Sequence, residues 1–239
     1  MGVTGIAITS KPLPFLGTPT DRVEALVWTV AGILATTAYA LIANLAFDTT
    51  TTAIEFISLA TGLACVWLSR TENIWSMPIG LCSVSLLGWF LLDVDLVAQG
   101  WLQYLFYVPI SFVGWWMWAR GGDHRTELPV TSLGRMGWII TVASGISTWA
   151  ICLLVFNSIY EDARHLAWDS SIVGASIAAQ VLMTYKKREC WFLWTVPVNL
   201  SSVGLYLATG NWAFLFLYLV FTANSVWAWS DWNRSLRTP

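Results

Sequence analysis

Eight apolar stretches, separated by short polar connections, divide the chain. They span residues 23–47, 52–68, 74–92, 101–119, 136–157, 168–185, 190–208 and 212–230, and none carries a charge near its centre. A membrane-spanning helix needs about 20 apolar residues and satisfies its own backbone hydrogen bonds in lipid. The stretches do not alternate as the strands of a membrane barrel do. The pattern predicts an all-α integral membrane protein with eight transmembrane helices.

The composition agrees with this assignment. Of 239 residues, 56% are hydrophobic and 11% are charged, and the mean hydropathy is +0.63. Soluble domains carry about 25% charged residues, so water-soluble classes are excluded. Eight spans leave no length for a separate catalytic domain. The net charge of −2 and the lack of a basic face also argue against a nucleic-acid partner.

The basic residues predict the orientation. In the eight-span arrangement, all Lys and Arg residues except Arg164 fall on one side of the membrane. They are Lys11, Arg22, Arg70, Arg120, Arg125, Arg135, Lys186, Lys187, Arg188, Arg234 and Arg237. The positive-inside rule then places both termini in the cytoplasm. The opposite, outer side carries Asp48, Asp93, Asp95, Glu161, Asp162 and Asp169. The first apolar stretch is too long for a cleaved signal peptide, so none is expected.

Candidate chemistry for catalysis or metal binding is sparse. The cysteines are Cys65, Cys82, Cys152 and Cys190. They lie in or beside apolar stretches without clustered spacing, so we interpret them as packing residues rather than disulfides or zinc ligands. His124 and His165 fall in loops on opposite sides of the membrane and cannot share a site. No catalytic triad or phosphate-binding loop is visible. The sequence therefore predicts no enzyme activity, no cofactor and no metal.

An internal repeat relates two parts of the chain. Residues 75–78 (WSMP) match 194–197 (WTVP). Further on, Trp101, Tyr107, Trp116 and Trp118 match Trp212, Tyr218, Trp227 and Trp229. The repeat predicts an N-terminal segment with an extra helix (1–50), a three-helix unit (51–119), a linker helix (120–160) and a second three-helix unit (161–239). This is a 3+1+3 parallel repeat, an arrangement known in transporters whose substrates bind between the repeats. Chance matching in a Trp-rich chain is the alternative.

Neutral polar residues recur on one face of two predicted helices. Gln103, Tyr107, Ser111 and Gly114 follow helical spacing, as do Tyr218, Thr222 and Ser225, with Asn224 one step around. Gln180 and Asn199 lie at similar depth. Such amides and hydroxyls can bind a polar substrate or can simply hydrogen-bond neighbouring helices. No ionisable residue lies near a span centre, so a proton relay is not predicted and a passive carrier fits better than a pump.

The chain resembles the PnuC-type nicotinamide riboside transporters, which share the 3+1+3 arrangement of the SWEET sugar transporters. Three segments carry the resemblance: residues 191–194 (WFLW) before Pro197 and Asn199, residues 73–80 (NIWSMPIG) and residues 211–218 (NWAFLFLY). The resemblance covers roughly three quarters of the chain, from the second apolar stretch to the last. It implies uptake of nicotinamide riboside, an NAD precursor, across a bacterial inner membrane by facilitated diffusion. It also implies a homotrimer in contact with membrane lipid.

The resemblance singles out two tryptophans, and the internal repeat singles out two prolines. Trp191 and Trp194 lie on the same side of one helix, near Asn199, where an indole face would stack on a cationic pyridinium ring. The alternative interpretation of these two tryptophans is that they belong to the belt of tryptophans at the membrane interface. Pro78 and Pro197 occupy equivalent repeat positions and are candidate hinges for alternating access, or else static bends.

The predicted substrate-binding residues are therefore Trp191, Trp194, Asn199, Gln180, Gln103, Tyr107, Tyr218 and Asn224. Two alternatives to the nicotinamide riboside carrier stay open. One is a carrier of another vitamin, nucleoside or sugar, such as thiamine. The other is a membrane scaffold that binds a ligand without transporting it.

Overall fold

The computed structural model describes residues 15–47, 50–159 and 165–236. Its helices are α1 (Pro19–Phe47), α2 (Ala53–Arg70), α3 (Ser76–Asp93), α4 (Val97–Leu102), η1 (Gln103–Tyr107), α5 (Val108–Arg120), η2 (Asp123–Arg125), α6 (Arg135–Ile159), α7 (Leu166–Thr184), α8 (Cys190–Leu193), η3 (Trp194–Leu200), α9 (Ser201–Thr209) and α10 (Trp212–Ser235). Within the described residues, strand-like pairing is limited to an isolated bridge between Thr131 and Lys187. The predicted all-α fold class is confirmed.

Two of the long helical rods are built from three consecutive segments. The segments α4, η1 and α5 form one rod, and α8, η3 and α9 form another, with a π-helical segment in the middle of each. With the six other long helices, the described residues make eight rods, which match the eight predicted spans. Six of them, searched over the described residues, are long and apolar enough by composition to cross a membrane. The other two, 97–120 and 212–235, carry many Trp, Tyr and neutral polar side chains.

Local sequence signals set several helix ends. Thr52 and Glu55 form a capping box at the start of α2, where each side chain accepts the other residue's backbone N–H, at 3.2 and 2.7 Å. Gly210 ends α9 in the left-handed conformation, with φ +71°, which a residue without Cβ adopts readily. Asn211 then accepts the N–H of Phe214 and starts α10. The tight turn makes α9 and α10 antiparallel neighbours.

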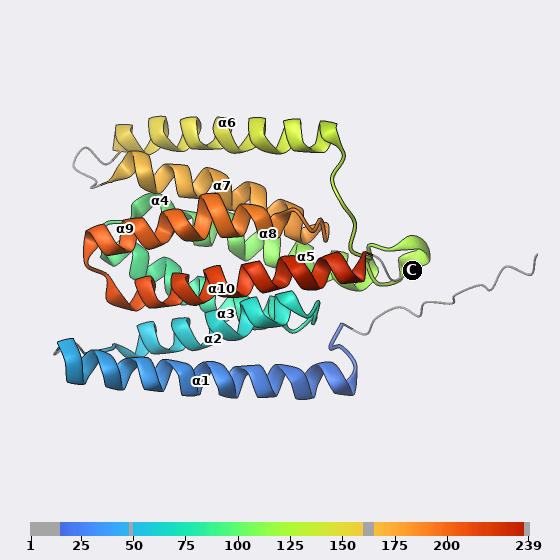
Figure 1. The fold of residues 1–239 in the computed structure, drawn as a ribbon. Coiled ribbons are helices and arrows are strands. Elements are labelled where there is room, and N and C mark those ends of the chain that lie inside the picture. Colours follow the sequence, from blue (N-terminus) through green and yellow to red (C-terminus); the bar gives the residue numbers. More distant parts are fainter. Residues whose placement is uncertain (1–14, 48–49, 160–164, 237–239) are drawn as a thin grey trace, which may run out of the picture.

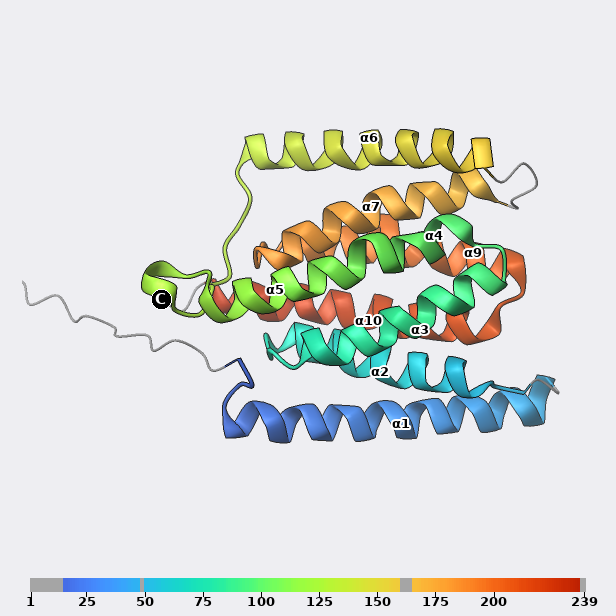
Figure 2. The ribbon, with the colours of Figure 1, turned by 180° about the vertical axis from the view of Figure 1, so that it is seen from behind.

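The rods form a bundle with α1 along one edge and α6 along the opposite edge (Figures 1 and 2). Helix α1 packs on α2, and α6 packs on α7. Most of the large apolar side chains of these two edge helices are exposed, as lipid-facing surfaces require. Between them, α2 and α7 run in the same direction, and each begins a three-rod unit (Figure 1). The arrangement is the predicted parallel 3+1+3 repeat with an extra N-terminal helix.

One end of the bundle carries an ion-pair network, near the C-terminal end of α10 (Figure 1). The Nζ atom of Lys186 is 2.9 Å from a carboxylate oxygen of Glu72 and 3.0 Å from one of Glu127, and it lies over the ring of Trp118. The Lys186 side chain is 1% exposed. Arg70 pairs with Asp231 at the same end. Lys186, counted as a loop residue in the orientation argument, is therefore buried and joins the two units to the segment that links them. Lys11, Arg164 and Arg237 lie outside the described residues.

Candidate functional site

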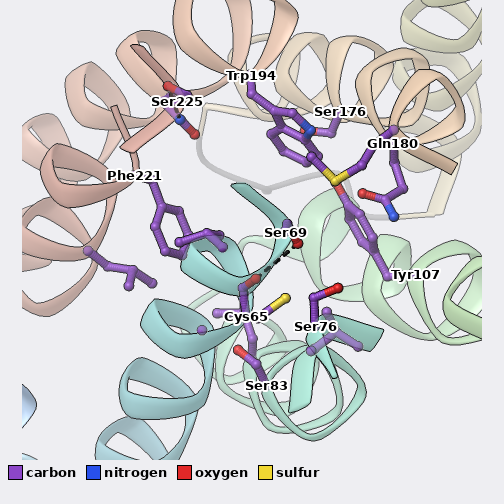
Figure 3. Close-up of a pocket in the computed structure, with 18 of the residues that line it drawn as sticks. Cys65, Ser69, Ser76, Ser83, Tyr107, Ser176, Gln180, Trp194, Phe221 and Ser225 are labelled. Atoms are coloured by element: carbon purple, nitrogen blue, oxygen red, sulfur yellow. Dashed lines mark hydrogen bonds between the residues drawn. The ribbon is translucent and has the colours of Figure 1, made fainter. Parts of the chain in front are cut away.

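A cavity of about 140 Å³ lies between the two three-rod units. This is roughly ten times the space that one water molecule needs. Figure 3 shows its walls. The lining residues are Gly62, Cys65, Val66 and Ser69 of α2; Ser76, Gly80, Ser83, Val84 and Leu87 of α3; Gln99, Leu102, Gln103, Tyr107 and Ser111 of the α4–α5 rod; Ser176, Gln180 and Met183 of α7; Trp191, Trp194 and Asn199 of the α8–α9 rod; and Leu217, Tyr218, Phe221, Asn224 and Ser225 of α10. The edge helices α1 and α6 contribute none of these.

All eight residues predicted to bind substrate line this cavity. They are Gln103, Tyr107, Gln180, Trp191, Trp194, Asn199, Tyr218 and Asn224. They come from both units, and residues more than a hundred positions apart in the chain face one space. Figure 3 labels Tyr107, Gln180 and Trp194 on one side of this space, with Ser225 and Phe221 on another. The structure thus brings the predicted residues together, while their role in binding stays a prediction.

π-Helical turns shape two walls of the cavity. Residues 103–107 form the first π-helical segment, so that the N–H of Val108 reaches back to the carbonyl of Gln103. Pro109 follows directly and has no N–H to continue an α-helical ladder. In the second unit, Pro197 lies inside the π-helical segment 194–200. Such turns are frequent at functional sites, because the wider turn reorients side chains and frees backbone groups.

The aromatic residues of the cavity differ in their surroundings. The rings of Trp194 and Tyr107 lie with centroids 6.5 Å apart and planes inclined by 28°, and Trp194 is only partly buried. Trp191 is 2% exposed and packs edge-on against Trp232, with centroids 5.4 Å apart. The prediction treated Trp191 and Trp194 as an equivalent pair. In the structure Trp194 offers the more accessible ring face, whereas Trp191 is largely part of the packed core.

Several polar atoms of the cavity wall have no hydrogen-bond partner within the described residues. They belong to Ser76, Gln99, Trp191, Trp194, Asn199 and Asn224. Both asparagines donate from Nδ2, Asn199 to Ser225 at 3.4 Å and Asn224 to the carbonyl of Val66 at 3.0 Å, while each Oδ1 is unpaired. Buried polar groups are nearly always paired in folded proteins. The residues of the wall therefore contain buried indole and amide donors, together with amide acceptors, that have no partner within the described residues.

The wall carries no formal charge. None of the described lining residues is Asp, Glu, Lys, Arg or His. Among the described residues, no group of three or more His, Cys, Asp or Glu side chains is placed to hold a metal ion. Cys65 lines the cavity and Cys190 is buried beside it, so the predicted packing role of the cysteines describes Cys190 better than Cys65. The wall can therefore bind a ligand by hydrogen bonding and aromatic stacking.

Sequence reasoning missed some of the wall. Gln99 was not predicted, because the apolar stretch was taken to begin at Trp101, whereas the rod begins at Val97. Its position four residues before Gln103 is the signal that would have found it. Small wall residues were also missed. They are Cys65, Ser69, Ser76, Ser83 and Ser176. Single serines inside apolar helices give no distinctive pattern, so no sequence signal marks them.

The two proposed hinge prolines are not equivalent. Pro78 is the third residue of α3, in the first turn, where backbone N–H groups have no partner within the helix. It therefore removes no hydrogen bond from the interior of α3 and does not interrupt that helix. Pro197 does lie within a helical rod, at its π-helical turn. The hinge role remains a prediction, and Pro197 is the residue whose position suits it.

Comparison with known proteins gives consistent matches. A sequence model of the nicotinamide mononucleotide transporter family matches residues 52–234, which excludes α1. The nicotinamide riboside transporter PnuC of Neisseria mucosa is 30% identical in an alignment of 198 residues that covers 76% of this chain and 72% of that protein. The riboflavin/roseoflavin transporter RibM of Streptomyces davaonensis is 26% identical in an alignment of 180 residues that covers 72% of this chain and 80% of that protein. The crystal structure of the vitamin B3 transporter PnuC superposes with a TM-score of 0.70 and 26% identity, over 92% of this chain and 93% of that one.

Proposed function

Because the chain belongs to the nicotinamide mononucleotide transporter family, we propose that it is a passive carrier that takes up nicotinamide riboside. The observation that carries this proposal is the cavity between the two units, whose neutral wall combines a stacking surface with unpaired hydrogen-bonding atoms. Relatives that are named nicotinamide riboside transporters support the choice of substrate.

The proposed binding mode follows from the wall. The pyridinium ring stacks on Trp194, opposite Tyr107, where a cation over an indole face gains about 2 kcal/mol when desolvated. The carboxamide and the ribose hydroxyls then pair with the amides of Asn199, Asn224 and Gln99, whose unpaired atoms include both donors and acceptors. A few placed polar groups in a mostly apolar pocket are enough to give specificity.

The neutral wall favours the riboside over its phosphorylated form. Proteins bind phosphate with Arg, Lys or the start of a helix, because the dianion needs compensating charge. No lining residue among the described ones is basic. A nucleotide would bury its phosphate against indoles, hydroxyls and amides alone. We therefore expect the mononucleotide to bind much more weakly than the riboside.

The proposal extends to location and assembly. The distribution of basic residues supports cytoplasmic termini, and the resemblance to bacterial transporters supports a bacterial inner membrane. The absence of charged side chains from the described cavity wall supports facilitated diffusion without a proton relay. Resemblance to the family supports a homotrimer and a SWEET-like mode of alternating access. The exposed apolar faces of α1 and α6 contact lipid or neighbouring subunits.

Isothermal titration calorimetry of the purified protein against a ligand panel tests the proposed substrate. The panel contains nicotinamide riboside, nicotinamide mononucleotide, nicotinamide, thiamine, riboflavin and a simple sugar. Riboflavin is included because of the similarity to RibM. The proposal expects tight binding of nicotinamide riboside alone. Tight binding of another member without nicotinamide riboside would make the chain a carrier of that compound, and binding without flux in vesicles would make it a ligand-binding scaffold.

A further inference from the structure

A single carboxylate lies buried beside the cavity, at the end of the bundle opposite the ion-pair network. Asp169 is in the first turn of α7, and the residue is 1% exposed. The orientation argument placed it only among the acidic residues of the outer side. The structure instead buries it between α7 and the start of the α4–α5 rod, where one of its oxygens accepts the backbone N–H of Ala98 at 3.1 Å.

Asp169 lies directly behind the cavity wall. Its carboxylate is beside the side chain of Gln99, which lines the cavity, and it interacts electrostatically with the phenol of Tyr218, which also lines the cavity. The hydroxyl of Tyr206 donates to Oε1 of Gln99 at 3.3 Å and so fixes the amide between the carboxylate and the cavity. The charge therefore acts on the cavity through one layer of side chains.

The charge of Asp169 is not balanced by the described residues. Asp169 takes part in none of the ion pairs found among them, and its Oδ1 atom has no hydrogen-bond partner there. The neighbouring Gln99 side chain interacts with the carboxylate, although its Nε2 has no partner within hydrogen-bond distance among the described residues. A buried charge without a partner is costly, and a cation bound nearby would offset that cost. The cavity wall itself contributes no charge, so Asp169 sets the sign of the potential at this end of the cavity.

We propose that Asp169 is a specificity-determining positioning residue, which acts through Gln99 to make the cavity select a cationic ring over an uncharged ring of the same shape. This inference rests on the proposed function and deepens it, because it assigns the charge selectivity of that site to one residue. It also accounts for a buried carboxylate in a membrane-embedded helix, where ionisable residues are usually functional.

The test compares two ligands that differ in charge. Nicotinamide riboside carries a pyridinium cation, whereas its dihydropyridine form has nearly the same size and no ring charge. Calorimetry gives the affinity for each ligand in the wild-type protein and in Asp169→Asn, which keeps an oxygen to accept the N–H of Ala98. We expect the variant to lower the preference for the cation about tenfold, as one unit charge acting across a few side-chain lengths at intermediate dielectric would. Affinity for the uncharged ligand is expected to stay unchanged.

The matched control is Asp95→Asn. Asp95 is an exposed carboxylate in the turn before α4, at the same end of the bundle, and asparagine tolerates its φ of +61°. The control should leave the ratio of the two affinities unchanged. An equal loss of affinity for both ligands in Asp169→Asn, or no change for either, would overturn the proposal, since Asp169 would then only hold α4 in place or play no part.

Two further measurements decide the outcome if the first variant does not fold. If Asp169→Asn does not fold, Asp169→Ser supplies a second uncharged variant with an acceptor oxygen. The affinities of the wild-type protein for the two ligands test the inference without any variant. Equal wild-type affinity for the two ligands would overturn the inference, and a clear preference for the cation would support it. A wild-type protein that binds neither ligand would instead refute the proposed function, and this inference would fall with it.

Discussion

Replacement of Trp194 by leucine removes the proposed stacking surface and leaves an apolar side chain in its place. In the structure, the Trp194 ring lies partly exposed to the cavity and 6.5 Å from the ring of Tyr107, while its indole N–H has no partner within the described residues. Leucine fills part of the same volume but offers no ring face and no donor. Trp194 also packs against the hydrophobic core, so the substitution removes the stacking surface together with some packing, and the stability of the variant must be measured beside its affinity.

The expected loss of affinity follows from the geometry. A desolvated cation over a tryptophan face contributes about 2 kcal/mol, and stacking of a base on an aromatic side chain contributes about 1–3 kcal/mol by alanine substitution. A loss of about 2 kcal/mol weakens binding roughly thirtyfold, because each 1.4 kcal/mol is a factor of ten. Trp194→Phe keeps a smaller ring face and should fall between the leucine variant and the wild type.

Calorimetric titration with nicotinamide riboside measures this difference. Trp116→Leu is the matched control, since Trp116 is 53% exposed on the outer face of α5 and does not line the cavity. Thermal unfolding in detergent confirms that both variants keep the fold. Binding by Trp194→Leu within about threefold of the wild type, with the fold intact, would refute the stacking site. Equal losses in the Trp194 and Trp116 variants would also refute it, because a general effect of tryptophan removal would explain both.

Three further substitutions test other parts of the account. If the π-helical turn is a hinge, Pro197→Ala should slow uptake more than it weakens binding measured by calorimetry. Pro78→Ala, in the first turn of α3, should change neither uptake nor binding. Equal effects of Pro197→Ala on binding and uptake would rule out the hinge. Glu72→Gln leaves buried Lys186 with Glu127 as its remaining carboxylate partner and should reduce the free energy of unfolding by about 1–3 kcal/mol, measured by denaturant titration. An unchanged unfolding midpoint would show that the buried ion pairs contribute nothing to stability.

The sequence allowed much of the bundle and the cavity to be predicted, because both depend on periodic patterns. Apolar length defines a membrane span, so all eight rods were expected. Helical spacing places Gln103 and Tyr107 on one face of a rod, and the repeat relates Tyr107 to Tyr218. Once the two units face each other, residues on these faces must meet. This is why the eight residues predicted to bind substrate all line one cavity.

The remaining features depend on helix boundaries and on long-range packing, which a pattern does not record. Gln99 and Pro78 were misjudged because a shift of a few residues in a helix start moves a side chain into the wall or a proline into a first turn. Asp169 and Lys186 entered the sequence prediction only as charges on one or the other side of the membrane, and their burial was not predicted. Their burial arises from partners far away in the chain, Ala98 for Asp169 and Glu72 for Lys186. The π-helical turns likewise became evident only from the backbone.

The central claim is that the cavity between the two units carries nicotinamide riboside across the membrane without an energy source. Purified protein reconstituted in vesicles and supplied with labelled nicotinamide riboside tests it directly. We predict saturable influx that stops when the inner and outer concentrations are equal. A protonophore or a collapsed sodium gradient should leave this influx unchanged. Trp194→Leu should slow it at low substrate concentration. No influx above protein-free vesicles, accumulation beyond equilibrium, or strong inhibition by the protonophore would contradict the account.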